Sequence, residues 1–128
     1  MMMKNVAVVD DDAIIRKTLR LILNKQYNIF TAKDFLEAMQ LYQENAIDLA
    51  IVDFRLGQGT GFDVIEAYRK AGFKGKALLI TAFTEFVDSN EAKKLDIAQV
   101  FSKPLDLEVL TQTIEDLLAN GQGNLKRA

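Results

Sequence analysis

The sequence contains no cysteine and no histidine among its 128 residues. Without cysteine, the chain can form no disulfide, no thiolate nucleophile and no thiolate metal site. Without histidine, it lacks the commonest general base and metal ligand of proteins, and it cannot carry a phosphoryl group on imidazole. Any chemistry must therefore use the side chains that remain, which are those of Asp, Glu, Lys, Thr, Ser and Tyr.

Clustered basic residues and long apolar runs are also missing. The 16 Lys and Arg are scattered among 18 Asp and Glu, and the net charge is −2, so no basic surface favours direct binding of nucleic acid. No apolar run approaches the length of a transmembrane helix, and Met1-Met2-Met3-Lys4 lacks the apolar core of a signal peptide. We therefore expect no membrane association and a cytoplasmic location.

The chain is long enough for one domain with a substantial core, since hydrophobic residues make up 49% of it. Apolar runs, of which 49–53 is the clearest, are typical of strands buried on both faces. Strands are predicted at 6–9, 27–32, 49–53, 76–80 and 97–101, and helices at 13–24, 34–43, 62–70, 84–95 and 106–119. This alternation predicts an α/β fold with a five-stranded parallel sheet between two layers of helices. The partly polar second strand suits an edge, which favours the doubly wound, flavodoxin-like order 2-1-3-4-5.

Polar side chains follow four of the predicted strands at the point where each strand ends. Asp10 and Asp11 follow the first strand, Asp53 ends the third, Thr81 follows the fourth and Lys103 follows the fifth. Because the carboxyl ends of parallel strands meet at one edge of a sheet, we expect these side chains to share a crevice. Clustered carboxylates without His or Cys suit Mg²⁺ or Mn²⁺, and a carboxylate can act as a nucleophile toward phosphorus.

Simpler interpretations exist for each residue alone. Asp10 and Asp11 could be turn residues, Asp53 and Thr81 could merely end strands, and Lys103 could be a solvated lysine. Their combination at successive strand ends favours a phosphoryl-transfer site, with Asp53 as the acceptor.

Four short motifs resemble the receiver domain of two-component response regulators. They are Val8-Val9-Asp10-Asp11, Ile51-Val52-Asp53, Ile80-Thr81-Ala82 and Lys103-Pro104, and Gly61 at the start of the third helix also matches. The resemblance covers residues 4–120 and leaves 121–128 as a polar tail or the start of a linker. It implies that Asp53 is phosphorylated in a Mg²⁺-dependent reaction, with Asp10, Asp11 and the Arg55 carbonyl as further metal ligands. It also implies that Thr81 contacts the phosphoryl group, that Lys103 pairs with phosphorylated Asp53, and that the Lys103–Pro104 peptide bond is cis.

The resemblance further implies a signalling switch in a phosphorelay rather than a metabolic enzyme. The expected donor is a sensor histidine kinase or a phosphotransfer protein, and the domain would assist its own phosphorylation and dephosphorylation. The surface that responds would comprise helix 84–95, strand 97–101 and helix 106–119. It would act on a downstream protein or on a C-terminal output domain, with a phosphorylation-linked homodimer as a further expectation.

Several positions depart from the pattern of the family or vary within it. Gly57 stands where proline is common, which predicts a more flexible loop. Val100 stands where Tyr or Phe is usual, which calls into question the usual coupling between the threonine and an aromatic side chain. Arg55 and Phe83 lie two residues after Asp53 and Thr81, at positions that resemble the family's tuners of phosphoryl lifetime.

Two other functions stay open at this point. A phosphatase with an aspartyl-phosphate intermediate often has a second Asp two residues after the nucleophile, where this chain has Arg55. An interaction module that works without phosphorylation would not require the complete set of Asp10, Asp11, Asp53, Thr81 and Lys103.

Overall fold

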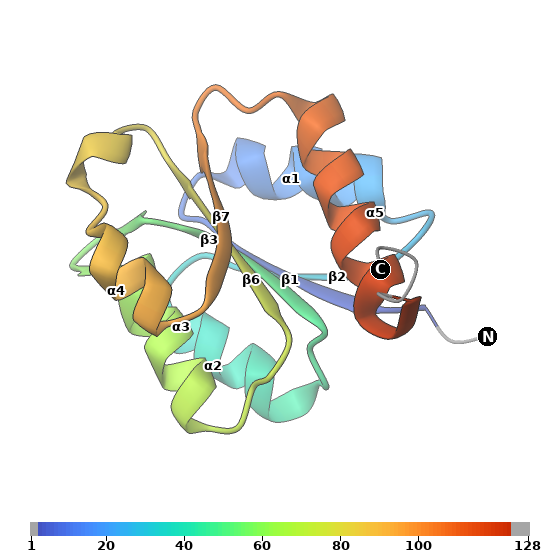
Figure 1. Cartoon of the computed structure of the whole chain (residues 1–128), viewed down its shortest axis with the longest axis horizontal. Coiled ribbons are helices and arrows are strands. Elements are labelled where there is room, and N and C mark those ends of the chain that lie inside the picture. The colour runs from blue at the N-terminus through green and yellow to red at the C-terminus, as the bar shows by residue number, and fades with distance from the viewer. Residues whose placement is uncertain (1–2, 124–128) are drawn as a thin grey trace.

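The computed structural model describes residues 3–123, with the side chains of residues 3–119. Its centre is a sheet of five parallel strands in the order β2-β1-β3-β6-β7 (Figure 1). These strands are β1 (Asn5–Val9), β2 (Asn28–Ala32), β3 (Leu49–Asp53), β6 (Lys76–Thr81) and β7 (Ile97–Ser102). Because β4 and β5 are short strands outside this sheet, the predicted order 2-1-3-4-5 is confirmed.

Helices cover both faces of the sheet (Figure 1). One face packs against α1 (Ala13–Leu23) and α5 (Leu107–Gly123), and the other packs against α2 (Phe35–Glu44), α3 (Gly61–Lys70) and the end of α4 (Ser89–Lys94). Alternate side chains of a strand point to opposite faces. Val8 of β1 therefore packs with the α1–α5 core, and Val9 with the α2–α3 core. The central strands are apolar between their end residues because both of their faces are buried.

The prediction of one continuous helix over 84–95 is wrong. The chain instead forms a 3₁₀ helix, η1 (Thr84–Phe86), followed by the short helix α4. Val87 between them has extended backbone, and the Asp88 side chain accepts hydrogen bonds from Asn90 N and Glu91 N. Asp88 is therefore an N-cap that starts a new helix, so the apolar residues around it do not form one stripe.

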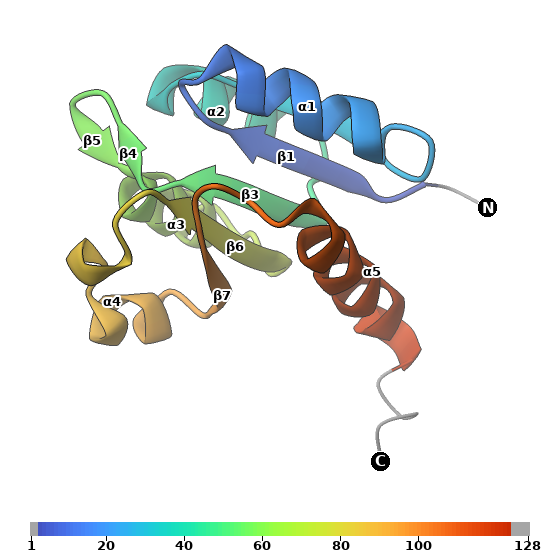
Figure 2. The same ribbon diagram turned by 90° about the horizontal axis from the view of Figure 1, so that it is seen from above.

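The loop after Asp53 contains a small hairpin that the sequence interpretation missed. Strands β4 (Arg55–Leu56) and β5 (Gly59–Thr60) pair antiparallel and project beyond the carboxyl end of β3 (Figure 2). Gly57 turns the chain between them with a φ of +64°, a conformation that favours glycine. Gly57 thus has a conformational role in a regular turn.

The last helix is longer than predicted, because α5 continues to Gly123. Residues 121–123 of the predicted tail or linker thus form the end of this helix, and its remaining positions, 124–128, lie outside the described residues. None of the helices within residues 3–123 combines the length and apolar character needed to cross a bilayer.

Candidate functional site

The carboxyl ends of β1, β3, β6 and β7 lie side by side, and backbone hydrogen bonds continue past their ends. Phe54 N donates to Ile80 O at 2.8 Å, and Lys103 N donates to Thr81 O at 2.8 Å. These bonds fix the residues that follow each strand relative to the neighbouring strand. The Lys103–Pro104 peptide bond is cis, as the family resemblance implied.

Three carboxylates gather at this edge, as the sequence predicted. Asp10, Asp11 and Asp53 each offer an oxygen within 4.8 Å of the others. Asp10 is 0% exposed and Asp53 is 5% exposed, whereas Asp11 is open to solvent. The pKa of Asp53 is raised to about 6, first by burial and then by the charge of Asp10, against the opposing effect of Lys103. Burial also raises the pKa of Asp10.

Lys103 supplies the positive charge of the cluster. Its Nζ lies 3.2 Å from Asp10 Oδ2 and 3.4 Å from Asp53 Oδ1. Burial lowers the pKa of Lys103, but the charges of Asp10 and Asp53 outweigh burial, so the pKa is raised overall. One ammonium cannot balance three carboxylates, and the site therefore retains excess negative charge that a divalent cation would neutralise.

Two hydrogen bonds fix Asp10, one to its side chain and one to its backbone carbonyl. Its Oδ1 accepts a hydrogen bond from Asp12 N at 2.9 Å, and its backbone carbonyl accepts one from Arg16 Nη1 at 2.7 Å. Its buried Oδ2 accepts no hydrogen bond in the described part of the chain and faces Lys103. An available oxygen of this kind, beside two other carboxylates, fits a hard metal ion such as Mg²⁺.

Arg16 is a site residue that the sequence interpretation missed. The helical pattern of α1 placed it on the outward face, but the side chain is half-buried and reaches back to Asp10. The one feature of the sequence that could have identified Arg16 is its position four residues after Asp12, the N-cap of α1. A long side chain in the first turns of a helix can fold back over the turn that precedes it.

Thr81 is 1% exposed at the end of β6. Its Oγ1 accepts a hydrogen bond from Phe83 N at 3.0 Å, and no bond donated by this hydroxyl occurs within residues 3–119. The hydroxyl proton therefore has no protein acceptor there. The same contact ties the backbone after β6 to the side chain at the strand end.

Gly61, the first residue of α3, lies directly against the backbone of Asp53. A Cβ built at this position would lie 2.5 Å from Asp53 O and 3.0 Å from both Leu79 Cδ1 and Val52 Cγ1. Only glycine fits such a close approach of the helix to the strand. Its backbone N–H donates to Phe54 O at 2.7 Å, which fixes the turn that carries Asp53.

The other predicted site residues lie around the carboxylates. Arg55 in β4, Phe83 and Pro104 are exposed, and Val100 in β7 is half-buried against the α2–α3 core. Phe83 packs against Phe86, with ring centroids 5.7 Å apart. The structure thus brings together Asp10, Asp11, Asp53 and Lys103, whereas Arg55 and Phe83 are exposed in the segments that follow β3 and β6.

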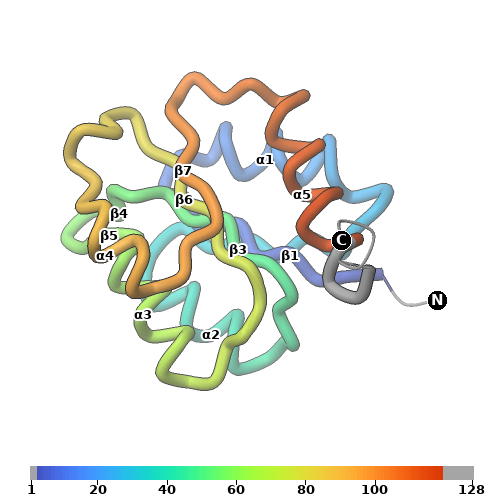
Figure 3. Tube along the Cα trace, viewed as in Figure 1, coloured from blue at the N-terminus to red at the C-terminus, as the bar shows by residue number. Residues whose placement is uncertain are grey.

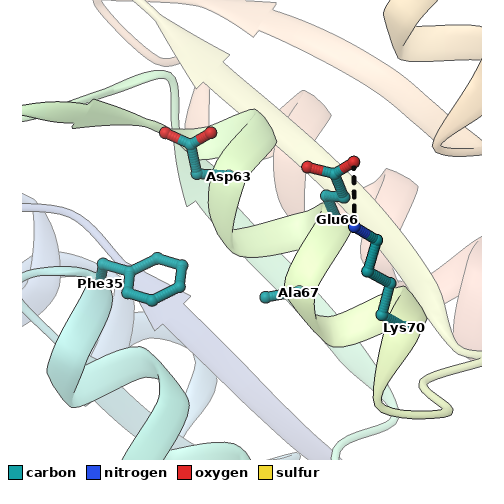
Figure 4. A pocket seen from close by; sticks show the side chains of 5 residues that line it. All are labelled: Phe35, Asp63, Glu66, Ala67 and Lys70. Carbon is teal, nitrogen blue, oxygen red and sulfur yellow. Dashed lines mark ion pairs between the residues drawn. The ribbon is translucent and has the colours of Figure 1, made fainter.

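A second hollow lies between α2 and α3, away from the strand ends (Figure 4). Phe35 and Ala67 form its apolar walls. Its carboxylates have other partners, because Asp63 accepts from Thr60 N at 2.9 Å and Glu66 lies 3.7 Å from Lys70 Nζ. Asp63 completes the capping box of α3. These groups are therefore helix-stabilising, in contrast to the carboxylates at the strand ends.

The chain matches one protein family along most of its length. The family model of the response regulator receiver domain matches residues 6–115. Sporulation initiation phosphotransferase F of Bacillus subtilis is 25% identical over 119 residues, which cover 92% of this chain and 96% of that protein. The transcriptional regulatory protein GlrR of Escherichia coli is 28% identical over 87% of this chain, but the match spans only 25% of the length of GlrR.

Solved structures give the same result. The response regulator protein TrrA from Thermotoga maritima, in complex with Mg²⁺–BeF, superposes with a TM-score of 0.79 at 27% identity. The match covers 90% of this chain and 99% of that chain. The relatives thus include a protein that the match covers almost completely and a longer regulator of which it covers only a quarter.

Proposed function

This chain belongs to the response regulator receiver domain family, and we propose that it works as a phosphorylation-dependent switch with Asp53 as the phosphoacceptor. Receiver domains are regulatory phosphoacceptor domains of two-component systems. The proposed donor is the phosphohistidine of a sensor kinase or phosphotransfer protein, because the chain has no histidine of its own. The proposed domain comprises residues 4–120.

The proposed reaction transfers a phosphoryl group from nitrogen to oxygen. A carboxylate oxygen of Asp53 attacks phosphorus, the P–N bond of the donor breaks, and the imidazole leaves with its electron pair. Asp10, Asp11, Asp53 and the Arg55 carbonyl would hold Mg²⁺, which would neutralise charge on the transferred group. Lys103 would pair with a phosphoryl oxygen, and the Thr81 hydroxyl would donate its proton in a hydrogen bond to another.

The excess of carboxylates over cations around Asp53 is the observation that carries this proposal. A raised pKa of about 6 leaves Asp53 ionised at neutral pH and more basic than an ordinary carboxylate. The buried Asp10 Oδ2, which accepts no hydrogen bond in the described part of the chain, supports the metal assignment.

The proposed switch begins at Thr81. Attraction of its hydroxyl to the phosphoryl group would turn Oγ1 away from Phe83 N, which now donates to it at 3.0 Å. The segment after β6, including η1 and α4, would then rearrange and so change the surface that it forms with β7 and α5. Val100 is half-buried where the family usually has an aromatic side chain, so the response does not depend on a large ring at that position.

Intact mass spectrometry after incubation with acetyl phosphate tests the assignment. The native chain should gain a single phosphoryl group only when Mg²⁺ is present, and Asp53→Asn should gain none. Asp116→Asn on the exposed side of α5 is the matched control and should behave like the native chain. An adduct that persists in Asp53→Asn would show that another residue is the acceptor.

The lifetime of the adduct tests the flanking residues. Arg55 and Phe83 are exposed next to Asp53 and Thr81, where they can shield the acyl phosphate from water. Arg55→Ala and Phe83→Ala should therefore shorten the lifetime. An unchanged rate of dephosphorylation in both variants would contradict this role.

A further inference from the structure

Arg69 in the last turn of α3 donates hydrogen bonds to four backbone carbonyls in two separate segments. Nη1 donates to Phe73 O at 3.1 Å and to Gly75 O at 2.8 Å, in the loop between α3 and β6. Nε donates to Leu95 O at 3.0 Å and Nη2 donates to Asp96 O at 3.2 Å, in the turn between α4 and β7. A planar guanidinium is suited to this task because its donors point in fixed directions.

The guanidinium is itself fixed on the α2–α3 side. Its Cζ lies 4.9 Å from the centroid of the Phe73 ring, within the range of a cation–π contact. Phe73 packs edge-on against Tyr68 and Tyr42, at centroid distances of 5.7 and 6.2 Å. No carboxylate of the described chain lies within 4.0 Å of the Arg69 nitrogens. The cation thus serves backbone carbonyls rather than an ion pair.

The turn at Leu95 and Asp96, which Arg69 contacts on its other side, is preceded by a segment with few buried side chains. Neither η1 nor α4 contains a buried residue, and Leu95, at 7% exposure, is the first side chain after them to enter the core. Asp96 adopts a φ of +57°, a left-handed conformation that is costly for a residue other than glycine. Leu95 is the C-cap of α4 and Asp96 follows it, and Arg69 provides donors to the carbonyls of both residues.

From this geometry we propose that Arg69 is a positioning residue that fixes the Leu95–Asp96 turn to α3. The segment between Thr81 and this turn then has one end at the phosphorylation site and the other end at Arg69. The traces of α3 and α4 run close together in Figure 3, as the bonds between Arg69 and the turn require. A displacement at Thr81 would therefore turn η1 and α4 about the Arg69 end instead of loosening β7 as well. This last step depends on the proposed function.

Amide hydrogen exchange measured by NMR in the resting protein tests the attachment without any phosphorylation. Arg69→Met keeps the side-chain stem but removes every donor, and Arg69→Lys keeps the charge without the planar fork. Both variants should raise the exchange rates of amides in 92–100 by about tenfold or more, and rates in β1 and β3 should stay within about twofold. Lys70→Met, the adjacent position with only a surface ion pair, is the matched control and should change neither region.

An equal rise in exchange across all regions would show that Arg69 only contributes to global stability, and it would overturn the proposal. Unchanged rates in 92–100 would overturn it as well. The two variants also guard against misfolding, since Arg69→Lys retains a cation and a long stem at the position.

A second measurement follows the response to Mg²⁺ with beryllium fluoride. In the native chain, amide signals should shift around Asp53 and Thr81 and also in η1 and α4. In Arg69→Met, the shifts around Asp53 should persist, and new shifts should spread into β7. An identical response in both proteins would contradict the role of Arg69 in switching. If the native chain itself shows no response, the proposed function fails, and the resting exchange rates still decide whether Arg69 fixes the turn.

Discussion

The α2–α3 layer and the η1–α4 segment cover neighbouring parts of the same sheet face, but they are held in different ways. In the α2–α3 layer, Tyr68 is fully buried, its hydroxyl donates to Ala38 O at 2.7 Å, and its ring centroid lies 4.7 Å from that of Tyr42. In the η1–α4 segment, no side chain is buried, and Phe83 and Phe86 are 46% and 62% exposed.

This difference in burial indicates that the two regions have different roles. The α2–α3 layer positions Asp53, because Gly61 of α3 packs directly against the backbone of Asp53. The η1–α4 segment is attached at its ends, through Thr81 and through Leu95 with Arg69, and between them the half-buried Val87 packs against the α2–α3 core. Regions with few buried contacts open and rearrange at low free-energy cost. A change at Asp53 should therefore be expressed in the η1–α4 segment while the scaffold beneath it stays fixed.

Truncation of Tyr68 should have the largest effect on stability. Tyr68→Ala removes a buried ring from the aromatic cluster and should lower the free energy of unfolding by about 3–5 kcal/mol. Tyr68→Phe should cost about 1–2 kcal/mol, since it removes the buried hydrogen bond to the Ala38 carbonyl. Urea denaturation measures both. A loss below 1 kcal/mol in Tyr68→Ala would remove the basis of the comparison.

Removal of the Asp53 charge should stabilise the metal-free protein in a pH-dependent way. The pKa of Asp53 is about 6 in the folded chain and 3.8 for an unperturbed group, so the folded state binds more protons between these values. Stability from this group is therefore present at low pH and is lost as the pH rises toward 6. Asp53→Asn should be more stable than the native chain by about 1–3 kcal/mol at pH 7.5 and similar to it near pH 4.

Thermal unfolding in a chelating buffer at the two pH values measures this difference. Mg²⁺ should then stabilise the native chain more than Asp53→Asn, because the carboxylate cluster is intact only in the native chain. Equal stability of the two proteins at pH 7.5 would contradict the electrostatic account of the site.

Loss of the N-cap of α2 should destabilise the whole domain, whereas loss of the N-cap of α4 should affect only α4. Asp34 caps α2 through Glu37 N, and Asp88 caps α4 through Asn90 N and Glu91 N. Asp34→Ala should lower the global free energy of unfolding by about 1 kcal/mol. Asp88→Ala should raise amide exchange within α4 and leave the global value nearly unchanged, because that segment can open alone. Equal global losses would show that α4 unfolds together with the scaffold.

Truncation of Phe86 should have the smallest effect. The ring is 62% exposed and contacts chiefly Phe83, so Phe86→Ala should change the free energy of unfolding by no more than about 0.5 kcal/mol. Urea denaturation of Phe86→Ala and Tyr68→Ala, measured together, compares two aromatic residues that lie over the same face of the sheet. A loss close to that of Tyr68→Ala would show that the segment is packed as firmly as α3.

The central sheet and the carboxylate cluster could be predicted because each depends on simple rules. Doubly buried strands produce continuous apolar runs, and the carboxyl ends of parallel strands meet, so Asp10, Asp53 and Thr81 had to be close. The β4–β5 hairpin could not be inferred in this way, since two-residue strands carry no periodic pattern.

The interruption between η1 and α4 did have a signal in the sequence. Asp88 followed three residues later by Glu91 is typical of a helix start, but Phe86, Val87 and Leu95 suggested one continuous stripe. The contacts of Arg16 and Arg69 depend on where carbonyls of other segments lie in the fold. Spacing along the chain cannot give that information, so neither residue could be assigned a role from the sequence.

Hydrogen exchange followed by mass spectrometry, with and without Mg²⁺ and beryllium fluoride, tests the central claim most directly. The account predicts that exchange changes in peptides spanning 82–94, while peptides from α2 and α3 stay unchanged, and that Asp53→Asn shows no change in 82–94. Changes of similar size in α2, α3 and the η1–α4 segment would contradict the division between a fixed scaffold and a responding segment.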